Sequence, residues 1–183
     1  QFYDVGVDTR LPYRVYGGLQ DNGSWGGPSR KRGSVGPLNS DWLRIGGGDG
    51  FICRADPNDP DVVYAEMQYG RFWRVNVATG ARATLKTPTP RGKKPRFNWK
   101  APFLLSHHNS RIYYNAGNFV FRSLNRGDKL EAISPQISRT DRGTATALAE
   151  SPRDAKVLWV GTDDGALWIT RDGGSKWVNI TEK

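Results

Sequence analysis

The sequence predicts an all-β fold of the β-propeller class, with about four four-stranded antiparallel blades. The first observation behind this prediction is a register of glycines, because Gly33, Gly80, Gly127 and Gly174 follow one another at intervals of 47 residues. Periods of about 20 to 50 residues are typical of propellers and solenoids. The second is the composition, since 22 glycines, 11 prolines and seven each of Trp, Tyr and Phe suit many short strands joined by turns.

We expect one propeller segment in which every blade repeats the same four strands. The expected blades span residues 1–45, 46–90, 91–138 and 139–183. The second strand of each carries a large aromatic residue in a comparable position: Tyr16, Tyr64, Tyr114 and Trp159. A blade cannot bury both faces of its sheet alone, so it must stack on its neighbours. Four blades can close into a ring or form an arc of a larger one; we expect an arc, whose end blades need a partner chain or the rest of the polypeptide.

Apolar runs predict the strands of the first two blades, and Gly, Pro, Asn and Asp between them predict the turns. The pair Asn22 and Gly23 is a strong hairpin signal. Residues 56–61 are expected to form a turn; their oxygen-rich side chains suit calcium, but the spacing and terminal Glu of an EF-hand are missing. The expected strands are 2–8, 14–19, 41–45, 51–55, 62–66, 71–75 and 81–85.

The last two blades are expected to repeat this plan after a basic, proline-rich connection at residues 87–96. Residues 106–110 and 151–154 are turn sequences in these blades. The expected strands are 101–105, 111–115, 119–122, 130–133, 144–149, 157–161, 166–169 and 177–180.

The net charge of +9 requires that binding to nucleic acid or another polyanion be considered. The charge is clustered at residues 30–32 and 91–96, both within Gly-, Pro- and Ser-rich loop sequence. We interpret these clusters as solvated loops, because no nucleic-acid-binding motif accompanies them. We therefore expect no nucleic-acid partner. Polyanion binding through both basic loops, residues 30–32 and 91–96, is a weaker alternative, in which Lys93, Lys94 and Arg96 would contribute to binding.

The remaining composition limits the class of protein further. Cys53 is the single cysteine, which excludes an intramolecular disulfide and a cysteine-based metal site, and its apolar strand context indicates a buried thiol. No apolar run is long enough to span a membrane, and no signal peptide is present. Because the chain starts at Gln1 inside a predicted strand, we interpret it as a fragment or a processed chain.

The last blade contains a turn at residues 170–177 that reads Ser/Thr-x-Asp-x-Gly-x-x-Trp. This pattern resembles the Asp-box, or bacterial neuraminidase repeat. Together with residues 2–5, 13–24, 47–51 and 159–165, it makes the chain similar to the sortilin-like Asp-box β-propeller group, in the form found in exported bacterial proteins labelled glycosyl-hydrolase-like. The resemblance implies a secreted, periplasmic or cell-surface location. It also implies structural roles for the residues of the box: Thr170, Asp172, Gly174 and Trp177.

The sharpest polar positions are Asp21 and Asp49, each in a glycine-rich turn. In a propeller, the turns at one end of the strands surround the central channel, where ligands bind. Two carboxyl groups about 5 to 9.5 Å apart can perform acid/base chemistry on a glycosidic bond. Xyloglucan-cleaving propellers with Asp-boxes are a precedent on a related fold. The alternative is that Asp21 and Asp49 only order their turns.

Further ligand-binding candidates lie in or beside the same kind of turn: Gln20, Asn22, Trp25, Asp163 and Asp164. Trp25, with Tyr69 and Trp99, is expected to be an exposed loop aromatic that stacks on sugars or clamps a peptide. We expect no cofactor and no metal. The sequence favours a non-catalytic binding or scaffold propeller that engages a peptide, protein or glycan at the channel face. A glycoside hydrolase that uses Asp21 and Asp49 is the alternative.

Overall fold

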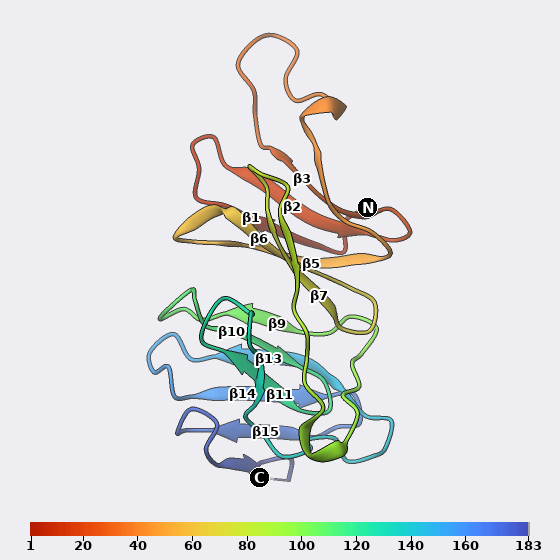
Figure 1. Cartoon of the computed structure of the whole chain (residues 1–183), viewed down its shortest axis with the longest axis vertical. Helices are drawn as coiled ribbons and strands as arrows, with labels where there is room; N and C mark the ends of the chain where they lie inside the picture. The colour runs from red at the N-terminus through yellow and green to blue at the C-terminus, as the bar shows by residue number, and fades with distance from the viewer. Residues whose placement is uncertain (183) are drawn as a thin grey trace. The chain divides into compact units, whose positions relative to one another are not determined.

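The computed structural model describes residues 1–182, with Arg91 described by its backbone alone. The described residues form four four-stranded antiparallel sheets and two 3-10 turns, η1 (Asn39–Asp41) and η2 (Pro90–Gly92). In each sheet the strands follow one another in chain order, as in a propeller blade. Figure 1 shows the strands coloured along the chain from the N-terminus to the C-terminus. The predicted all-β fold with four-stranded blades is therefore confirmed.

The four sheets form blades 1 to 4 in chain order. Blade 1 consists of β1 (Asp4–Val7), β2 (Arg14–Leu19), β3 (Gly23–Pro28) and β4 (Leu43–Gly46). Blade 2 consists of β5 (Gly50–Asp56), β6 (Asp59–Met67), β7 (Arg71–Asn76) and β8 (Arg82–Thr84). Blade 3 consists of β9 (Phe103–Leu105), β10 (Tyr113–Ala116), β11 (Val120–Ser123) and β12 (Glu131–Ala132). Blade 4 consists of β13 (Ala145–Glu150), β14 (Leu158–Thr162), β15 (Leu167–Thr170) and β16 (Trp177–Asn179).

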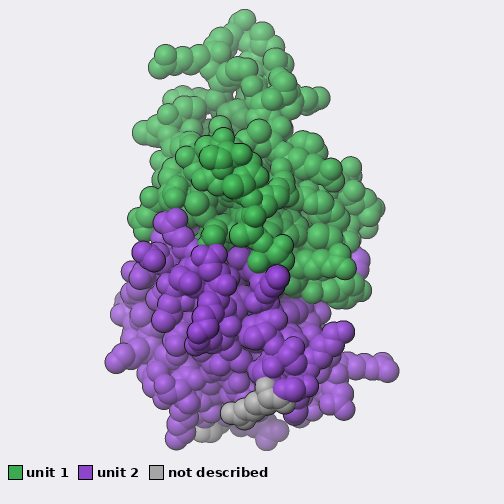
Figure 2. Space-filling view, viewed as in Figure 1, with its two compact units in different colours: residues 1–84 green, residues 85–183 purple. Residues whose placement is uncertain are grey.

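The chain divides into two compact units (Figure 2). Gln1–Thr84 holds blades 1 and 2, and Leu85–Lys183 holds blades 3 and 4. Each unit has its own buried cluster of apolar side chains between its two blades.

Two local expectations were wrong. The turn expected at residues 56–61 comprises only Pro57 and Asn58, because Asp56 pairs with Asp59 and β6 begins there. The buried Asp56 carboxylate accepts the Asn58 N–H at 2.9 Å, which closes this tight turn. Trp25 lies within β3 and is half-buried, whereas a loop position was expected.

The glycine register corresponds to one recurring backbone conformation. Gly33, Gly80, Gly127 and Gly174 all have positive φ, between 75° and 111°, in the segments between the third and fourth strands. A side chain is strained in this conformation, so the turn selects glycine. In blade 4 Thr170 Oγ accepts the Gly174 N–H at 3.0 Å, and in blade 3 Ser123 Oγ accepts the Gly127 N–H at the same distance. The two turns share one geometry despite their different sequences.

In the first unit, blade 1 packs on blade 2 through an apolar cluster. Tyr16 and Ile45 of blade 1 are buried against four residues of blade 2: Cys53, Val63, Ala65 and Val75. Each large side chain buried in this way contributes about 1.5–3 kcal/mol to stability. The backbones also approach closely, because a Cβ placed on Gly18 would lie 1.9 Å from the Gly50 carbonyl carbon. Glycine at position 18 therefore sets how near β2 comes to β5.

The second unit is built in the same way. Ala116, Val120 and Ile137, on β10, on β11 and after β12, pack against Ala145 and Val160 of blade 4. Indole N–H groups add directional contacts, since Trp168 donates to the Ile137 carbonyl at 2.8 Å and Trp177 to the Ile133 carbonyl at 2.7 Å. In the first unit Trp73 likewise donates to the Ile45 carbonyl at 3.2 Å.

An ion-pair cluster joins blades 1 and 2 beside the β1–β2 connection. The buried Asp8 carboxylate accepts from the Arg14 N–H at 2.8 Å and from the Tyr16 hydroxyl at 3.2 Å. Arg10 pairs with Asp8 and with Asp61 of blade 2. Burial raises the pKa of Tyr16 to about 12, and the Asp8 charge adds to the rise. The phenol therefore stays neutral and donates a hydrogen bond to Asp8.

Substitution of Gly18 by alanine tests the close approach of the two blades. We expect Gly18→Ala to lower the free energy of unfolding by about 1–3 kcal/mol or more, because the added methyl group meets backbone that cannot rotate away. Gly161→Ala is the matched control, since its Cβ would meet only Ala147 at 3.8 Å, an ordinary contact. Urea unfolding of the three proteins measures the difference. Equal stability of the two variants would contradict this packing.

Candidate functional site

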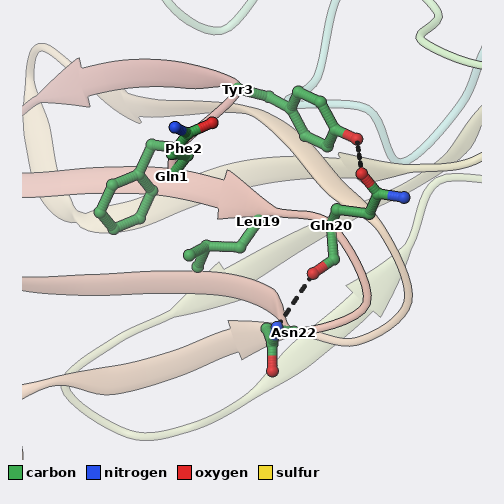
Figure 3. A pocket seen from close by; sticks show the side chains of 6 residues that line it. All are labelled: Gln1, Phe2, Tyr3, Leu19, Gln20 and Asn22. Carbon is green, nitrogen blue, oxygen red and sulfur yellow. Dashed lines mark hydrogen bonds between the residues drawn. The ribbon is translucent and has the colours of Figure 1, made fainter.

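The candidate site of the first unit is a cleft of about 380 Å³ beside the β2–β3 hairpin. Figure 3 shows the six residues that line it: Gln1, Phe2, Tyr3, Leu19, Gln20 and Asn22. The Tyr3 hydroxyl donates to Gln20 Oε1 at 2.8 Å, and Asn22 Nδ2 donates to the Gln20 carbonyl at 3.0 Å. The cleft therefore combines amide groups and a phenol with apolar side chains, which is the usual make-up of a site for a polar organic ligand.

The hairpin that carries Gln20 and Asn22 is held from the second blade. Asp21 has a φ of 58°, and its N–H donates to Asp49 Oδ1 at 2.6 Å. The N–H of Gly23, which has a φ of 75°, donates to the Gly48 carbonyl at 2.8 Å. Trp25 Nε1 donates to the Asn22 carbonyl at 2.7 Å. The β4–β5 connection thus fixes the hairpin, because its Gly48 carbonyl and Asp49 carboxylate accept two backbone N–H groups of the turn. The Trp25 indole supports the hairpin from within blade 1.

The two carboxylates proposed as an acid/base pair lie in different environments. Asp49 is 4% exposed, accepts the Asp21 N–H, and is itself positioned by Gln68, whose Oε1 accepts the Asp49 N–H at 3.0 Å. Asp21 is exposed at the tip of the hairpin. Neither Asp21 nor Asp49 is among the described residues that line the cleft. The geometry brings Asp21 and Asp49 together and gives Asp49 a role in ordering the turn.

The corresponding hairpin of blade 4 carries Asp163 and Asp164. Asp163 Oδ1 accepts the Thr144 N–H at 2.8 Å, and its Oδ2 accepts from the Thr144 hydroxyl at 3.0 Å and from Asn98 Nδ2 at 2.9 Å. Asp163 is nevertheless exposed, and Trp99, the next residue after Asn98, is 43% exposed. Asp163 therefore ties Asn98 and Thr144, the residue before β13, to the β14–β15 hairpin.

The half-buried Asp164 carboxylate accepts hydrogen bonds from several neighbouring residues. Thr162 Oγ donates to Oδ1 at 2.5 Å, while the N–H groups of Arg139 and Thr140 donate to Oδ2 at 2.8 Å each. Burial alone would raise the pKa of Asp164, but these hydrogen bonds outweigh burial and hold the pKa below its ordinary value of 3.8. Asp164 therefore stays ionised and orders the β12–β13 connection.

The turn at residues 170–177 lies at the other end of blade 4. Thr170 Oγ donates to Asp172 Oδ1 at 2.8 Å, and the same oxygen accepts the Lys176 N–H at 2.8 Å. This backbone bond, followed by the Thr170 hydroxyl, holds the pKa of Asp172 below its ordinary value. Because β15 separates this turn from the β14–β15 hairpin, Asp172 and Asp164 lie at opposite ends of one sheet.

The basic side chains of the two loops have different partners. Lys31 pairs with Asp41 at 2.8 Å. The Arg96 side chain donates to Ser138 Oγ at 3.3 Å and to the Gly143 carbonyl at 3.3 Å, and Lys93 donates to Gln136 Oε1 at 3.2 Å. The Arg91 side chain lies outside the described part of the chain. Arg96 therefore has a local role in ordering the 138–143 segment.

Sequence reasoning missed several residues that the structure places at these sites. Tyr3, Phe2 and Leu19 line the cleft, and Asn98 and Thr144 hold Asp163. The third-strand aromatic residues could have been found from a periodic signal, because they recur at nearly constant spacing: Trp25, Trp73, Phe121 and Trp168. Within residues 1–182, no group of three or more His, Cys, Asp or Glu side chains is arranged to hold a metal ion.

Comparison with known proteins shows the fold and no closer relationship. No protein-family model and no curated protein matches the chain. Among solved structures, it is similar to the GH74 xyloglucanase from Xanthomonas campestris, with a TM-score of 0.60, 14% identity, and coverage of 91% of this chain and 26% of that one. The GH74 enzyme from Niastella koreensis matches with a TM-score of 0.60, 14% identity, and coverage of 91% and 27%.

A third similar structure is the extracellular domain of a proposed one-component system from B. thetaiotaomicron, with a TM-score of 0.62, 12% identity, and coverage of 97% of this chain and 22% of that one. The chain spans about a quarter of the length of the structures it matches, which is consistent with an arc of a larger propeller. No helix in the described part of the chain has the length and apolar character needed to cross a membrane.

The lowered pKa of Asp164 predicts an acid-dependent loss of stability. A carboxyl group whose pKa is lower in the folded state stabilises the fold at pH values above its unfolded pKa, near 3.8, and this contribution disappears as the pH falls through the folded pKa. We expect Asp164→Asn to be less stable than the parent at pH 7 and to lose less stability below pH 4. Thermal unfolding between pH 7 and pH 2.5 measures both. Asp141→Asn, in the adjacent exposed loop, controls for charge, and parallel pH profiles for Asp164→Asn and the parent would refute the assignment.

Proposed function

We propose that this segment is a non-catalytic binding module of an exported protein, and that it engages a glycan at the cleft beside the β2–β3 hairpin. The observation that carries the proposal is the lining of that cleft by Gln1, Tyr3, Gln20 and Asn22 together with Phe2. Amides and a phenol suit the hydroxyl groups of a sugar, and an aromatic ring suits its apolar face. Peptide or protein ligands with exposed amides are the alternative occupants of the same groups.

An exported location is part of this proposal. It is supported by the similarity to an extracellular domain and to a xyloglucanase, and by the resemblance of residues 170–177 to the Asp-box of the sortilin-like group. We propose that the four blades, at residues 1–45, 46–90, 91–138 and 139–183, form one segment of a larger propeller. The faces of its first and last blades would then be covered by further blades of the same polypeptide or by a partner chain.

Binding of xyloglucan oligosaccharides tests the glycan proposal. We expect Gln20→Ala and Asn22→Ala each to weaken binding by about 5- to 10-fold, because each substitution removes a hydrogen-bonding amide from the cleft. Asn58→Ala is the matched control, since Asn58 is an exposed amide in the β5–β6 turn, at the other end of this unit's sheets. Isothermal titration calorimetry measures the affinities. Binding that is unaffected by Gln20→Ala and Asn22→Ala, or absent from the parent for a panel of plant and bacterial glycans, would refute the proposal.

A glycoside hydrolase is the second candidate, favoured by the 2.6 Å contact between the Asp21 N–H and Asp49 Oδ1, which brings two carboxyl-bearing residues together. The burial of Asp49 and its engagement with the hairpin argue for the non-catalytic proposal. If the segment hydrolyses xyloglucan, Asp21→Asn and Asp49→Asn should each lower the release of reducing sugar by at least about 100-fold. Undiminished hydrolysis in both variants would exclude this pair, and the absence of hydrolysis by the parent would exclude the activity.

A further inference from the structure

The third-strand tryptophans identify one interface that occurs twice within the chain. Trp73 of blade 2 packs with the apolar cluster of the first unit and donates to the Ile45 carbonyl of the preceding blade. Trp168 of blade 4 packs with the cluster of the second unit and donates to the Ile137 carbonyl, in the connection that follows β12. In both blades this tryptophan marks the face that receives the preceding blade.

Trp25 holds the corresponding position in blade 1. Strand pairing places it level with Gly17 and Val5, as Trp73 is level with Ala65 and Cys53 in blade 2. Because side chains alternate along a strand, Trp25 and Val5 lie on the face opposite Tyr16, and so point away from blade 2. In this blade the indole donates to the Asn22 carbonyl of its own hairpin.

The face of blade 1 that carries Trp25 is apolar and exposed. Val5 is 59% exposed, Val7 is 56% exposed and Phe2 is 42% exposed. Phe2, Trp25, Asn39 and Trp42 line a hollow of about 460 Å³ on this blade. Covering these exposed valines with another protein surface would remove apolar area from water and would stabilise the contact. An exposed apolar face of this kind is typical of a protein–protein interface.

Blade 4 presents the complementary face. Tyr16 and Tyr114 occupy the second-strand position that points toward the next blade, and they are 0% and 2% exposed. Trp159 holds the same position in blade 4 but is only half-buried. Ala147, Ala149 and Leu167, paired with Gly161 and Trp159, lie on the same face and are exposed.

From these two faces we infer that the Trp159 face of blade 4 binds the Val5 and Trp25 face of blade 1 in a second copy of this chain. The contact continues the blade-on-blade interface that each unit already contains. The contact joins two different surfaces and is therefore heterologous. After two copies pair, each retains one free face for a further copy, unless the assembly closes into a ring. The net charge of +9 opposes association, so the assembly is expected to strengthen with salt. The inference does not depend on the identity of the proposed ligand, although Phe2 lines both the cleft and the hollow on this face.

Sedimentation velocity on the 183-residue chain and on two face variants tests the inference. We expect the parent to associate at tens of micromolar in physiological salt, and Val5→Glu and Trp159→Glu each to be monomeric. An equimolar mixture of the two variants should form a 1:1 dimer and nothing larger, because the mixture retains one intact pair of faces. Leu124→Glu, at a 62% exposed leucine outside both faces, should associate like the parent.

Three outcomes would overturn the inference: a monomeric parent at 100 µM, continued self-association of both variants, or a mixture that stays monomeric. A monomeric parent would assign the two faces to other chains or to further blades. Val7→Glu and Leu167→Glu repeat the test at neighbouring exposed positions, and circular dichroism confirms that each variant is folded.

Discussion

The structure depends on the packing of one four-stranded blade against the next. A single blade has two apolar faces and no means to bury either, so its stability comes from the neighbour. Two devices make the contact in this chain. Glycine at position 18 allows β2 and β5 to approach closely, and the buried Tyr16 and the partly buried Trp73 pack in the same interface. Directional bonds from indole N–H groups to backbone carbonyls then fix the register of the contact.

This packing also positions the candidate sites. The hairpin with Gln20 and Asn22 belongs to blade 1, but the carboxylate that holds it, Asp49, comes from the connection that leads into blade 2. In blade 4, Asp164 is likewise bonded by the backbone of the segment that leads into β13. The hairpins of the candidate sites are therefore tied to the junctions between consecutive blades. A change in blade packing is expected to change the cleft, even where no lining residue is touched.

The fold could be predicted from the sequence because its signals are local and periodic. The glycines of the 47-residue register all have positive φ, which follows from turn geometry alone. The candidate site was harder to predict from the sequence. The hydrogen bond from the Asp21 N–H to Asp49 links residues 28 positions apart and depends on how two blades meet. The turn after Asp56 was predicted too wide because a buried carboxylate tightens it. Trp25 was assigned to a loop because the three glycines of β3, Gly23, Gly26 and Gly27, hide the strand pattern.

The most direct test of the blade interface is hydrogen exchange of the indole N–H groups, followed by NMR. The chain has seven tryptophans, of which Trp73, Trp168 and Trp177 donate to backbone carbonyls in the segments that precede their own blades. If these bonds hold the blades together, their indole protons should exchange only with global unfolding, and much more slowly than that of the exposed Trp99. Exchange of all seven indole protons at similar, unprotected rates would contradict the account.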